Sequence, residues 1–410
     1  MRDDSGDKRT TARCPKNIAV IGGGRWARVL TEVLCSVVPS ATSISVHSRH
    51  NAASMSSWIS EKGIGDRVRV SAQWPRLRPA GSNAVIVANA ARDHEAAVGP
   101  VLSAGLPVLV EKPIAPTAAT SLRLAELARS RNVRFAAAHV FLFARYIENF
   151  KTLVKQAGSP RWLRIHWVDP RNESRYGEKK RYDPGLPVFA DCLPHVLSIA
   201  GALTAGAAQS CRELEIFRGG AQVELELLLG DIPCKVRLVR NGSRRERLVE
   251  VAAGQEVLQL DFSIEPGVIR CGSSVVDADP EWAVQRRPVA CMLTAFLDWA
   301  DGGEFDSRLY IGVGVQATQV IEQAAEMYRS ALMPWVISEL AANPEGFDED
   351  LGYALGEILQ SNGSLERPVV EQQMERVRRH FAGTNGQQRS MALAESRDPS
   401  AILRSIAAAQ

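Results

Sequence analysis

Glu111-Lys112-Pro113 is the segment of this 410-residue chain that is best suited to chemistry. It follows Val108-Leu109-Val110, an apolar run that predicts a buried strand. Lys112 is therefore expected at the carboxyl end of a parallel strand, where open α/β sheets place their ligands. Pro113 restricts the backbone of Lys112 to extended conformations. A lysine desolvated beside a ligand can exchange a proton near neutral pH; the alternative is a surface lysine that ends a strand.

Asp191 and His195 form a second pair of reactive side chains. Four residues apart on a helix, they project from one face, so the carboxylate can orient or polarise the imidazole. Pro187 and Pro194 flank the stretch, so the helix is expected to begin near Pro187 and to be irregular before His195. A lone histidine among apolar helix residues is more commonly part of the core. The presence of Asp191 and Lys112 favours a catalytic role instead.

The glycine-rich turn 22–27 indicates a dinucleotide. It directly follows an apolar strand, Asn17–Ile21, and opens a helical pattern. Its first, third and sixth residues fit the G-x-G-x-x-G/A fingerprint, which allows a tight turn and places the pyrophosphate at a helix N-terminus. A glycine turn that binds nothing is the alternative. The residues expected to contact the cofactor here are Gly22, Gly24, Arg25, Trp26 and Ala27.

The end of the second expected strand favours NADP(H) over NAD(H). Folds that prefer NAD place a carboxylate here for the ribose hydroxyls, whereas this chain has Ser48-Arg49. A hydroxyl and a guanidinium suit a 2′-phosphate, and no Asp or Glu lies between Pro39 and Ser60 to repel it. Arg49 as a solvated surface residue is the alternative.

A charged segment, 171–183, precedes the Asp191 stretch. Its basic and tyrosine side chains suit a carboxylate, a phosphate or sugar hydroxyls, although charge runs commonly face water. The substrate-binding candidates are Arg145, Arg175, Tyr176 and Lys179.

Composition argues against several function classes. The net charge of +3 is far below that of a nucleic-acid-binding face, and no apolar run reaches the length of a membrane span. The seven cysteines include no CxxC pair, which fits reduced thiols in a cytoplasmic protein. No His, Cys or Asp cluster has the spacing of metal ligands, so no metal is expected.

Strand and helix patterns alternate in the first part of the chain, which predicts a first domain with parallel βαβ winding up to Ala138. The middle of the chain is rich in strands of period two. In Gln222–Leu229, for example, apolar residues alternate with glutamates, as in an antiparallel sheet with one covered face. Helices are expected at Val289–Trp299 and Val313–Met333.

The residues after Asn343 contain helical stretches at Asp348–Gln360, Pro368–Phe381 and Ala401–Ala409, with a break at Gly383–Gln388. They hold too few apolar residues for a core of their own, which predicts a packed arm and a mobile tail.

The predicted fold class is α/β, with four parts. A flexible tail (1–16) precedes an N-terminal Rossmann domain with a doubly wound parallel sheet (17–138). A C-terminal α+β domain with an open, mostly antiparallel sheet (139–340) and a helical extension (341–410) follow.

The chain resembles the glucose–fructose oxidoreductase/inositol dehydrogenase/rhizopine-catabolism family (GFO/IDH/MocA) from about Asn17 to about Arg329. The resemblance rests on the glycine turn and on four further motifs, namely Asn83-Ala84-Val85-Ile86-Val87 with Asn89-Ala90 and His94, Ala104-Gly105, Glu111-Lys112-Pro113-Ile114-Ala115, and Asp191-Cys192-Leu193-Pro194-His195. It implies cofactor contacts by Asn89, His94 and Glu111, and an open sheet that forms a homodimer or homotetramer. Two residues depart from the family pattern: Asn89-Ala90 replaces the common Thr-Pro, and Ser198 replaces an acidic residue.

We therefore expect an NADP(H)-dependent oxidoreductase that transfers hydride between the nicotinamide and a C=O/CH–OH of a polar, sugar-like molecule. Lys112 and His195 would stabilise charge on the oxygen, and one of them would deliver the proton. Asp191 would hold His195 or contact a substrate hydroxyl. Three alternatives stay open: an imine reductase of siderophore- or peptide-like biosynthesis, a non-catalytic NADP-binding regulator, and a dehydratase or hydrolase that uses the nicotinamide transiently. The sequence leaves three roles open for the extension, namely a lid, a dimer brace or an inert appendage.

Overall fold

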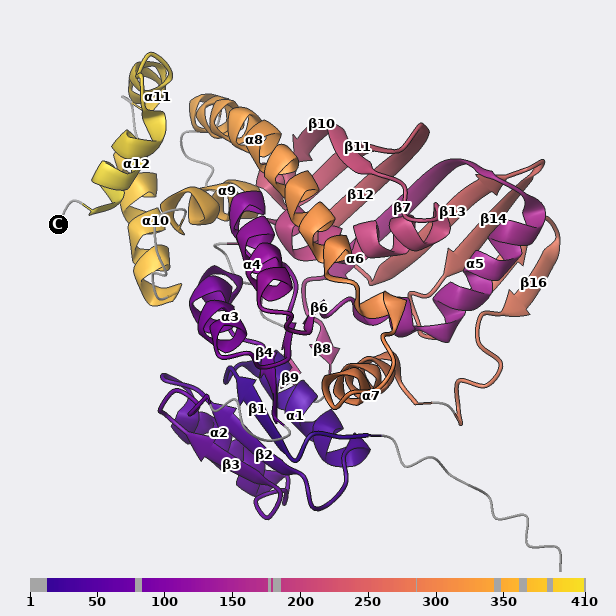
Figure 1. Ribbon diagram of the computed structural model, residues 1–410. Helices are drawn as coiled ribbons and strands as arrows, with labels where there is room; N and C mark the ends of the chain where they lie inside the picture. The colour runs from indigo at the N-terminus through magenta and orange to yellow at the C-terminus, as the bar shows by residue number, and fades with distance from the viewer. Residues whose placement is uncertain are drawn as a thin grey trace, which may run out of the picture. The chain divides into compact units, whose positions relative to one another are not determined.

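The computed structural model describes residues 13–77, 83–175, 178–179, 186–284, 286–342, 348–360, 367–381 and 386–408 (Figure 1). The chain divides into two compact units, Met1–Ala144 with Glu281–Val315 and Arg145–Pro280 with Gln316–Gln410. The sequence placed 281–315 in the second domain, whereas these residues return to the first unit. The reason is α7 (Pro288–Ala300), whose apolar face packs on α1 (Arg25–Val37), a tertiary contact that periodicity does not reveal.

A six-stranded parallel sheet forms the centre of the first unit. The strand order is β3-β2-β1-β4-β5-β6. The chain adds strands to one side of β1 up to β3 and then to the other side from β4 onward, with all strands parallel, which puts helices on both faces. The strands are β1 (Asn17–Ile21), β2 (Ser43–His47), β3 (Val68–Ser71), β4 (Asn83–Val87), β5 (Val108–Val110) and β6 (Phe135–Ala137). The remaining helices of this unit are α2 (Ala52–Glu61), η1 (Ala91–Asp93), α3 (His94–Ser103), α4 (Ala118–Ser130), η2 (Val140–Phe143) and η4 (Ser307–Leu309).

Two apolar clusters cover the two faces of this sheet. On one face, Leu30 and Leu34 of α1 pack with Phe296 of α7. On the other, Val98 of α3 and Leu124 of α4 pack against β4 and β5. The predicted doubly wound Rossmann sheet is confirmed.

The second unit contains an eight-stranded sheet of order β10-β11-β12-β7-β13-β14-β15-β16. Its strand pairs are antiparallel except for β12 and β7, which run parallel. The strands are β7 (Pro160–Pro170), β10 (Gln209–Phe217), β11 (Gln222–Leu229), β12 (Ile232–Gly242), β13 (Glu246–Ala253), β14 (Glu256–Asp261), β15 (Val268–Cys271) and β16 (Ser274–Asp277). The predicted mostly antiparallel sheet is confirmed, and β15 and β16 are additional strands that the sequence did not predict.

One face of this sheet is covered by α5 (Arg145–Ala157) and α6 (Val188–Leu203). Figure 1 shows both helices lying across the strands. On β11, Val223, Leu225 and Leu227 are buried while Glu224 and Glu226 are exposed, so the alternation in the sequence reports the covered face correctly. A short hairpin, β8 (Ser174–Arg175) and β9 (Glu178–Lys179), follows β7.

Three helical expectations need correction. Helix α6 begins directly after Pro187, as predicted, but runs without interruption through Pro194. Helix α8 (Ile311–Ala342) continues past Pro334, where the sequence ended it, because Val336 and Leu340 beyond the proline are buried. Part of the expected break at Gly383–Gln388 belongs to a helix that starts at residue 386; residues 382–385 lie outside the described residues.

The extension forms α9 (Glu349–Gln360), α10 (Arg367–Phe381), α11 (Gly386–Ala394) and α12 (Pro399–Ala408). Helices α10, α11 and α12 pack on one another, and α10 and α12 also pack on α9 (Figure 1). Leu403 and Ala407 of α12 are buried, so the described part of the expected mobile tail is packed helix. Of the expected N-terminal tail, 1–16, residues 1–12 lie outside the described residues.

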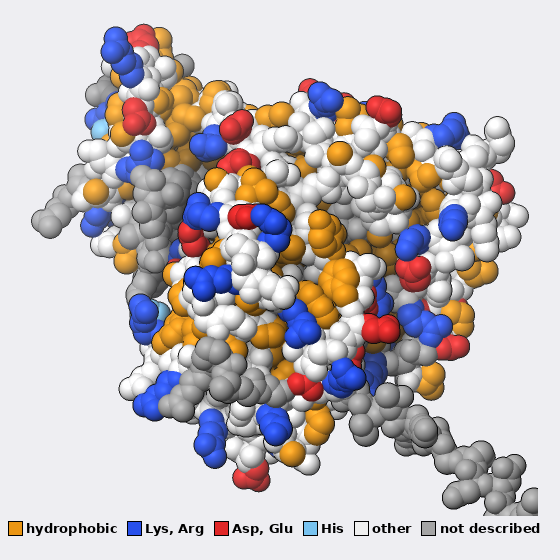
Figure 2. Space-filling model, viewed as in Figure 1, with side chains coloured by type: hydrophobic (Ala, Val, Ile, Leu, Met, Phe, Trp, Pro, Cys, Tyr) orange, Lys and Arg blue, Asp and Glu red, His pale blue; other side chains and the backbone are white. Residues whose placement is uncertain are grey.

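Within the described parts of the chain, no helix combines the length and the apolar character that crossing a membrane requires. Figure 2 shows basic and acidic side chains interspersed on the face in view rather than separated by sign.

Candidate functional site

The first unit brings the expected cofactor residues to one edge of its sheet. The glycine turn follows β1, Ser48-Arg49 follows β2, Asn89 follows β4, and Glu111-Lys112 follows β5. Because all of these strands run parallel, their carboxyl ends meet at the same edge, where doubly wound folds bind ligands.

The glycine turn leaves a cradle at the start of α1. Gly22 has φ +143°, and a Cβ there would lie 2.5 Å from the carbonyl oxygen of Ala88, so glycine is required. A Cβ on Gly24, the N-cap of α1, would meet no atom within 4 Å. Gly24 has no side chain that could cap this helix end, and the first turn of α1 holds no acidic residue. Its N–H groups and positive dipole end can therefore receive an anion.

Two buried polar atoms at this edge lack hydrogen-bond partners within the described chain, namely Asn89 Oδ1 and Arg25 Nη1. Buried polar atoms are normally satisfied, so such an acceptor and donor favour a bound ligand. Together with the cradle at Gly24, they fit a dinucleotide whose phosphates lie at the N-terminus of α1.

The turn after β2 is tightly packed against the glycine turn. The backbone N–H of Asn51 donates to Ser48 Oγ at 3.2 Å. A Cβ on Gly23 would collide with the Ser48 side chain. Gly23, which the sequence fingerprint leaves as a variable position, is thus required for packing, and Arg49 beside it is exposed.

Glu111 links the glycine turn to β5. Its carboxyl is buried and accepts a hydrogen bond from the Trp26 indole N–H, while the Lys112 backbone N–H donates to it at 3.3 Å. Burial raises the pKa of Glu111 to about 7, although the bond from Trp26 and the charge of Lys112 partly oppose this. Glu111 and Trp26, both expected cofactor contacts, are thus bonded to each other.

His94 is buried and holds the segment that carries Lys112. Its Nδ1 lies 2.8 Å from the carbonyl oxygen of Pro113, and its Nε2 lies 3.2 Å from that of Asn89. Burial lowers the pKa of His94, against the raising effect of these carbonyls. Its contacts are those of a residue that fixes the backbone after β4 and β5.

In the second unit, Asp191 and His195 lie one turn apart on α6, and both are partly buried. Asp191 Oδ2 is 3.4 Å from Nη2 of Arg240 on β12. The His195 ring stacks on Trp167 of β7, with centroids 5.5 Å apart and an interplanar angle of 17°. The stacking fixes the plane of the imidazole. Neither Arg240 nor Trp167 was selected from the sequence, because both lie far from α6 along the chain.

A buried arginine supports the Trp167 ring from β13. The guanidinium carbon of Arg247 lies 4.0 Å from the ring centroid of Trp167, a cation–π contact. Arg247 also pairs with the buried Asp169 and donates to the carbonyl oxygen of Val168 at 2.6 Å. A fully desolvated charge is tolerated here because it is paired and hydrogen-bonded.

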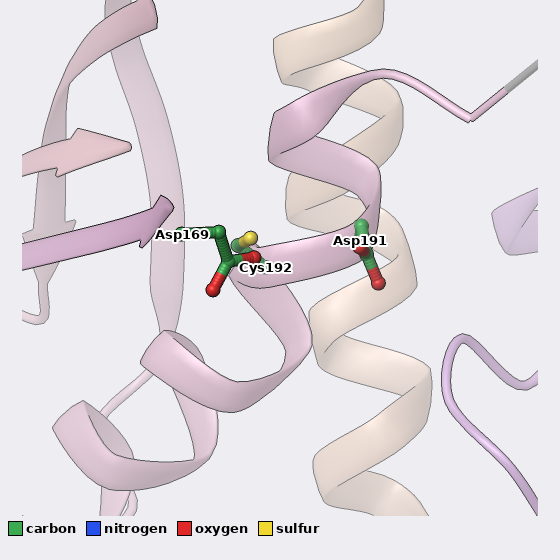
Figure 3. A group of neighbouring side chains, drawn as sticks. All are labelled: Asp169, Asp191 and Cys192. Carbon is green, nitrogen blue, oxygen red and sulfur yellow. The ribbon is translucent and has the colours of Figure 1, made fainter. Parts of the chain in front are cut away.

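Asp169, Asp191 and Cys192 form a small cluster whose ligand-type atoms all lie within 4.8 Å of one another (Figure 3). Its two carboxylates are engaged by arginines, Asp169 by Arg247 and Asp191 by Arg240. The two carboxylates of the cluster therefore each form an ion pair with an arginine.

The predicted substrate residues lie in the second unit. Arg145 begins α5 and has its Nε 3.9 Å from the buried Asp279. Arg175 lies in β8 and Lys179 in β9. Tyr176 lies outside the described residues.

Comparison with known proteins identifies the first unit. Residues 16–139 match the family described as "Oxidoreductase family, NAD-binding Rossmann fold" (GFO/IDH/MocA). This match confirms, for these residues, the resemblance that the sequence motifs predicted. No curated protein is detectably similar to the chain in sequence.

Several solved structures share the fold. A UDP-N-acetylglucosamine 3-dehydrogenase, GnnA, from Acidithiobacillus ferrooxidans has a TM-score of 0.60 at 17% identity, over 78% of this chain and 99% of that one. KijD10, a 3-ketoreductase from Actinomadura kijaniata in complex with TDP-benzene and NADP, scores 0.60 at 17% identity, over 76% and 97%. An oxidoreductase from Agrobacterium radiobacter in complex with NAD+, L-tartaric acid and magnesium scores 0.60 at 16% identity, over 77% and 96%. At such identities the likeness is one of fold.

Proposed function

We propose that the chain is an NADP(H)-dependent oxidoreductase that acts on a C=O/CH–OH of a polar, sugar-like small molecule. The observation that carries this proposal is the position of Lys112. It directly follows β5, at the sheet edge that holds the glycine turn, on a backbone fixed by Glu111 and His94. The names of two proteins of similar fold, a UDP-N-acetylglucosamine 3-dehydrogenase and a 3-ketoreductase, fit a sugar-like substrate.

The residues of the proposed site have two roles, which are positioning for hydride transfer and transfer of a proton. When bound, the nicotinamide supplies hydride to, or accepts it from, the substrate carbon. In the reductive direction, the carbonyl oxygen gains a proton from the Lys112 ammonium or the His195 imidazolium, and the C=O bond becomes CH–OH. Stacking on Trp167 holds the His195 ring. Asp191 orients His195 or accepts a bond from a substrate hydroxyl.

The preference for NADP(H) rests on Ser48 and Arg49. Both follow β2 next to the glycine turn, and Arg49 is exposed and so accessible to a 2′-phosphate. A hundredfold excess of NADPH over its Kd should stabilise the chain against thermal unfolding by about 3 kcal/mol relative to the free chain, and the same concentration of NADH should stabilise it less. Arg49→Asp should reverse this order, while Arg131→Asp, at an exposed position after α4, should not. Equal protection by both cofactors would refute the preference.

The substrate class is testable by oxidation of NADPH with a panel of keto-sugar nucleotides, free keto sugars and cyclic imines. Turnover of a keto sugar supports the proposal. Turnover of imines alone, or binding of NADPH without turnover of any compound, would overturn it.

We also propose that the open face of the eight-stranded sheet forms a homodimer or homotetramer interface. This face carries a hollow of about 330 Å³ lined by acidic and basic side chains. Lys235 pairs with Glu226 at 2.9 Å, and Arg164 with Glu250 at 3.1 Å. Rows of both signs allow a two-fold partner to place acid against base. Light scattering that reports a monomer at micromolar concentration would contradict this.

A further inference from the structure

Arg240, at the end of β12, connects the candidate catalytic carboxylate to the C-terminal extension. The guanidinium is buried. Its Nη1 donates to the carbonyl oxygen of Leu186 and to the hydroxyl of Tyr353, each at 2.9 Å. Its Nη2 lies 3.4 Å from Asp191 Oδ2. One side chain of α9 therefore bonds the same cation that pairs with Asp191.

A second polar residue of α9 enters the same buried region. Glu357 lies one turn after Tyr353, is buried, and accepts a hydrogen bond from the Tyr328 hydroxyl of α8. Burial raises the pKa of Glu357 to about 7, and the nearby Arg240 partly opposes this. Burial would lower the pKa of Arg240, but its surroundings raise it overall, chiefly Tyr353 and then Asp191, so Arg240 stays charged.

The body of the second unit is shaped to receive α9. Gly219 and Gly220, in η3 (Arg218–Gly220), both have positive φ, of 62° and 89°. A Cβ on Gly219 would collide with the backbone carbonyl of Asp350 on α9, and one on Gly220 would collide with the Tyr328 hydroxyl. Arg218 adds an ion pair with Asp350 at 3.4 Å. The glycine at position 219 therefore allows the close approach of α9, and the glycine at position 220 allows that of Tyr328 on α8.

We propose that α9 is a positioning element of the active site, in which Tyr353 fixes Arg240 and Arg240 fixes Asp191. The extension is then a brace inside the second unit. The proposal rests on the proposed function, because it assigns α9 to the site of Asp191 and His195. Tyr353 is a positioning residue that acts through Arg240.

Tyr353→Phe tests the link, because it removes one hydroxyl and keeps the ring that fills the space. A hydrogen bond to a charged group is worth roughly tenfold in rate when it holds a reacting group. We expect kcat to fall about tenfold while the Kd for NADPH is unchanged. Leu355→Val is the control, a change of similar size in the buried apolar face of α9. At a thermal stability equal to that of Tyr353→Phe, its kcat should stay within about twofold of the wild-type value.

A double-mutant cycle shows whether the effect passes through Asp191. If it does, Tyr353→Phe lowers turnover no further in an Asp191→Asn background. Additive losses, or a loss of the same size in Leu355→Val, would overturn the proposal.

A readout without substrate separates this proposal from the proposed function. Labelled histidine gives an NMR resonance for the His195 ring, one turn from Asp191. Tyr353→Phe should shift that resonance, and Leu355→Val should not. If the His195 resonance shifts in Tyr353→Phe but the chain oxidises no NADPH, the proposed function is refuted and the connection from Tyr353 to Asp191 stands. If the chain is active but the resonance does not shift, that connection is refuted.

Discussion

Replacement of Glu111 by glutamine should stabilise the first unit at alkaline pH. Glu111→Gln keeps an acceptor for the Trp26 indole N–H and removes the buried charge. In the folded chain, burial raises the pKa of Glu111 from its ordinary 4.5 to about 7. Between these two values the folded state binds more protons than the unfolded state, so the wild-type chain loses stability as the pH rises through this window.

The rise in pKa from 4.5 to about 7 corresponds to a loss of about 3 kcal/mol in the free energy of unfolding, an order-of-magnitude figure. The loss is complete above pH 7. Glu111→Gln removes this dependence. The variant and the wild type should therefore be about equally stable near pH 4.5, and the variant should be the more stable by about 3 kcal/mol at pH 8.

The assay is urea unfolding at several pH values, read by hydrogen-exchange mass spectrometry on peptides that contain β5. This readout follows the first unit alone. Glu126→Gln is the control, because Glu126 is exposed on α4 and its pKa is lowered rather than raised, chiefly by the hydrogen bond from Arg129. A stability difference that is constant with pH, or a variant less stable at pH 8, would refute the reasoning about Glu111.

Two further predictions concern packing. Gly22→Ala should abolish NADPH binding and lower the melting temperature, because its Cβ would lie 2.5 Å from the Ala88 carbonyl oxygen. Gly24→Ala should leave the melting temperature unchanged and weaken only NADPH binding. Equal effects of the two variants on the melting temperature would count against the cradle. Asp169→Ala should cost about 3–5 kcal/mol in urea unfolding of the second unit, because it leaves the buried Arg247 charge uncompensated, and a cost below about 1 kcal/mol would show that this pair is dispensable.

The sequence predicts the first unit well because its signals are local. The apolar strand before the glycine turn and the strand before Glu111 each identify themselves within a few residues. Parallel winding then brings them to one edge, so Lys112 and the glycine turn are placed near each other by topology alone.

The second unit is predicted less completely because its interactions are distant in sequence. Tyr353 bonds Arg240 across 113 residues, and Arg247 pairs with Asp169 across 78. No periodicity signals such pairs. Proline also misleads when packing overrides it, as at Pro334, where buried residues on both sides keep α8 continuous.

The central claim is that Lys112 and His195 serve hydride transfer from NADPH. The most direct measurement is transfer of deuterium from NADPH labelled at C4, in both stereoisomers, to the carbonyl carbon of a keto-sugar nucleotide, followed by mass spectrometry of the product. We expect label from one stereoisomer in the product, and rates lower by about 10²-fold or more in Lys112→Ala and His195→Ala with NADPH binding intact. Absence of label from both isomers, or an unchanged rate in both variants, would contradict the account.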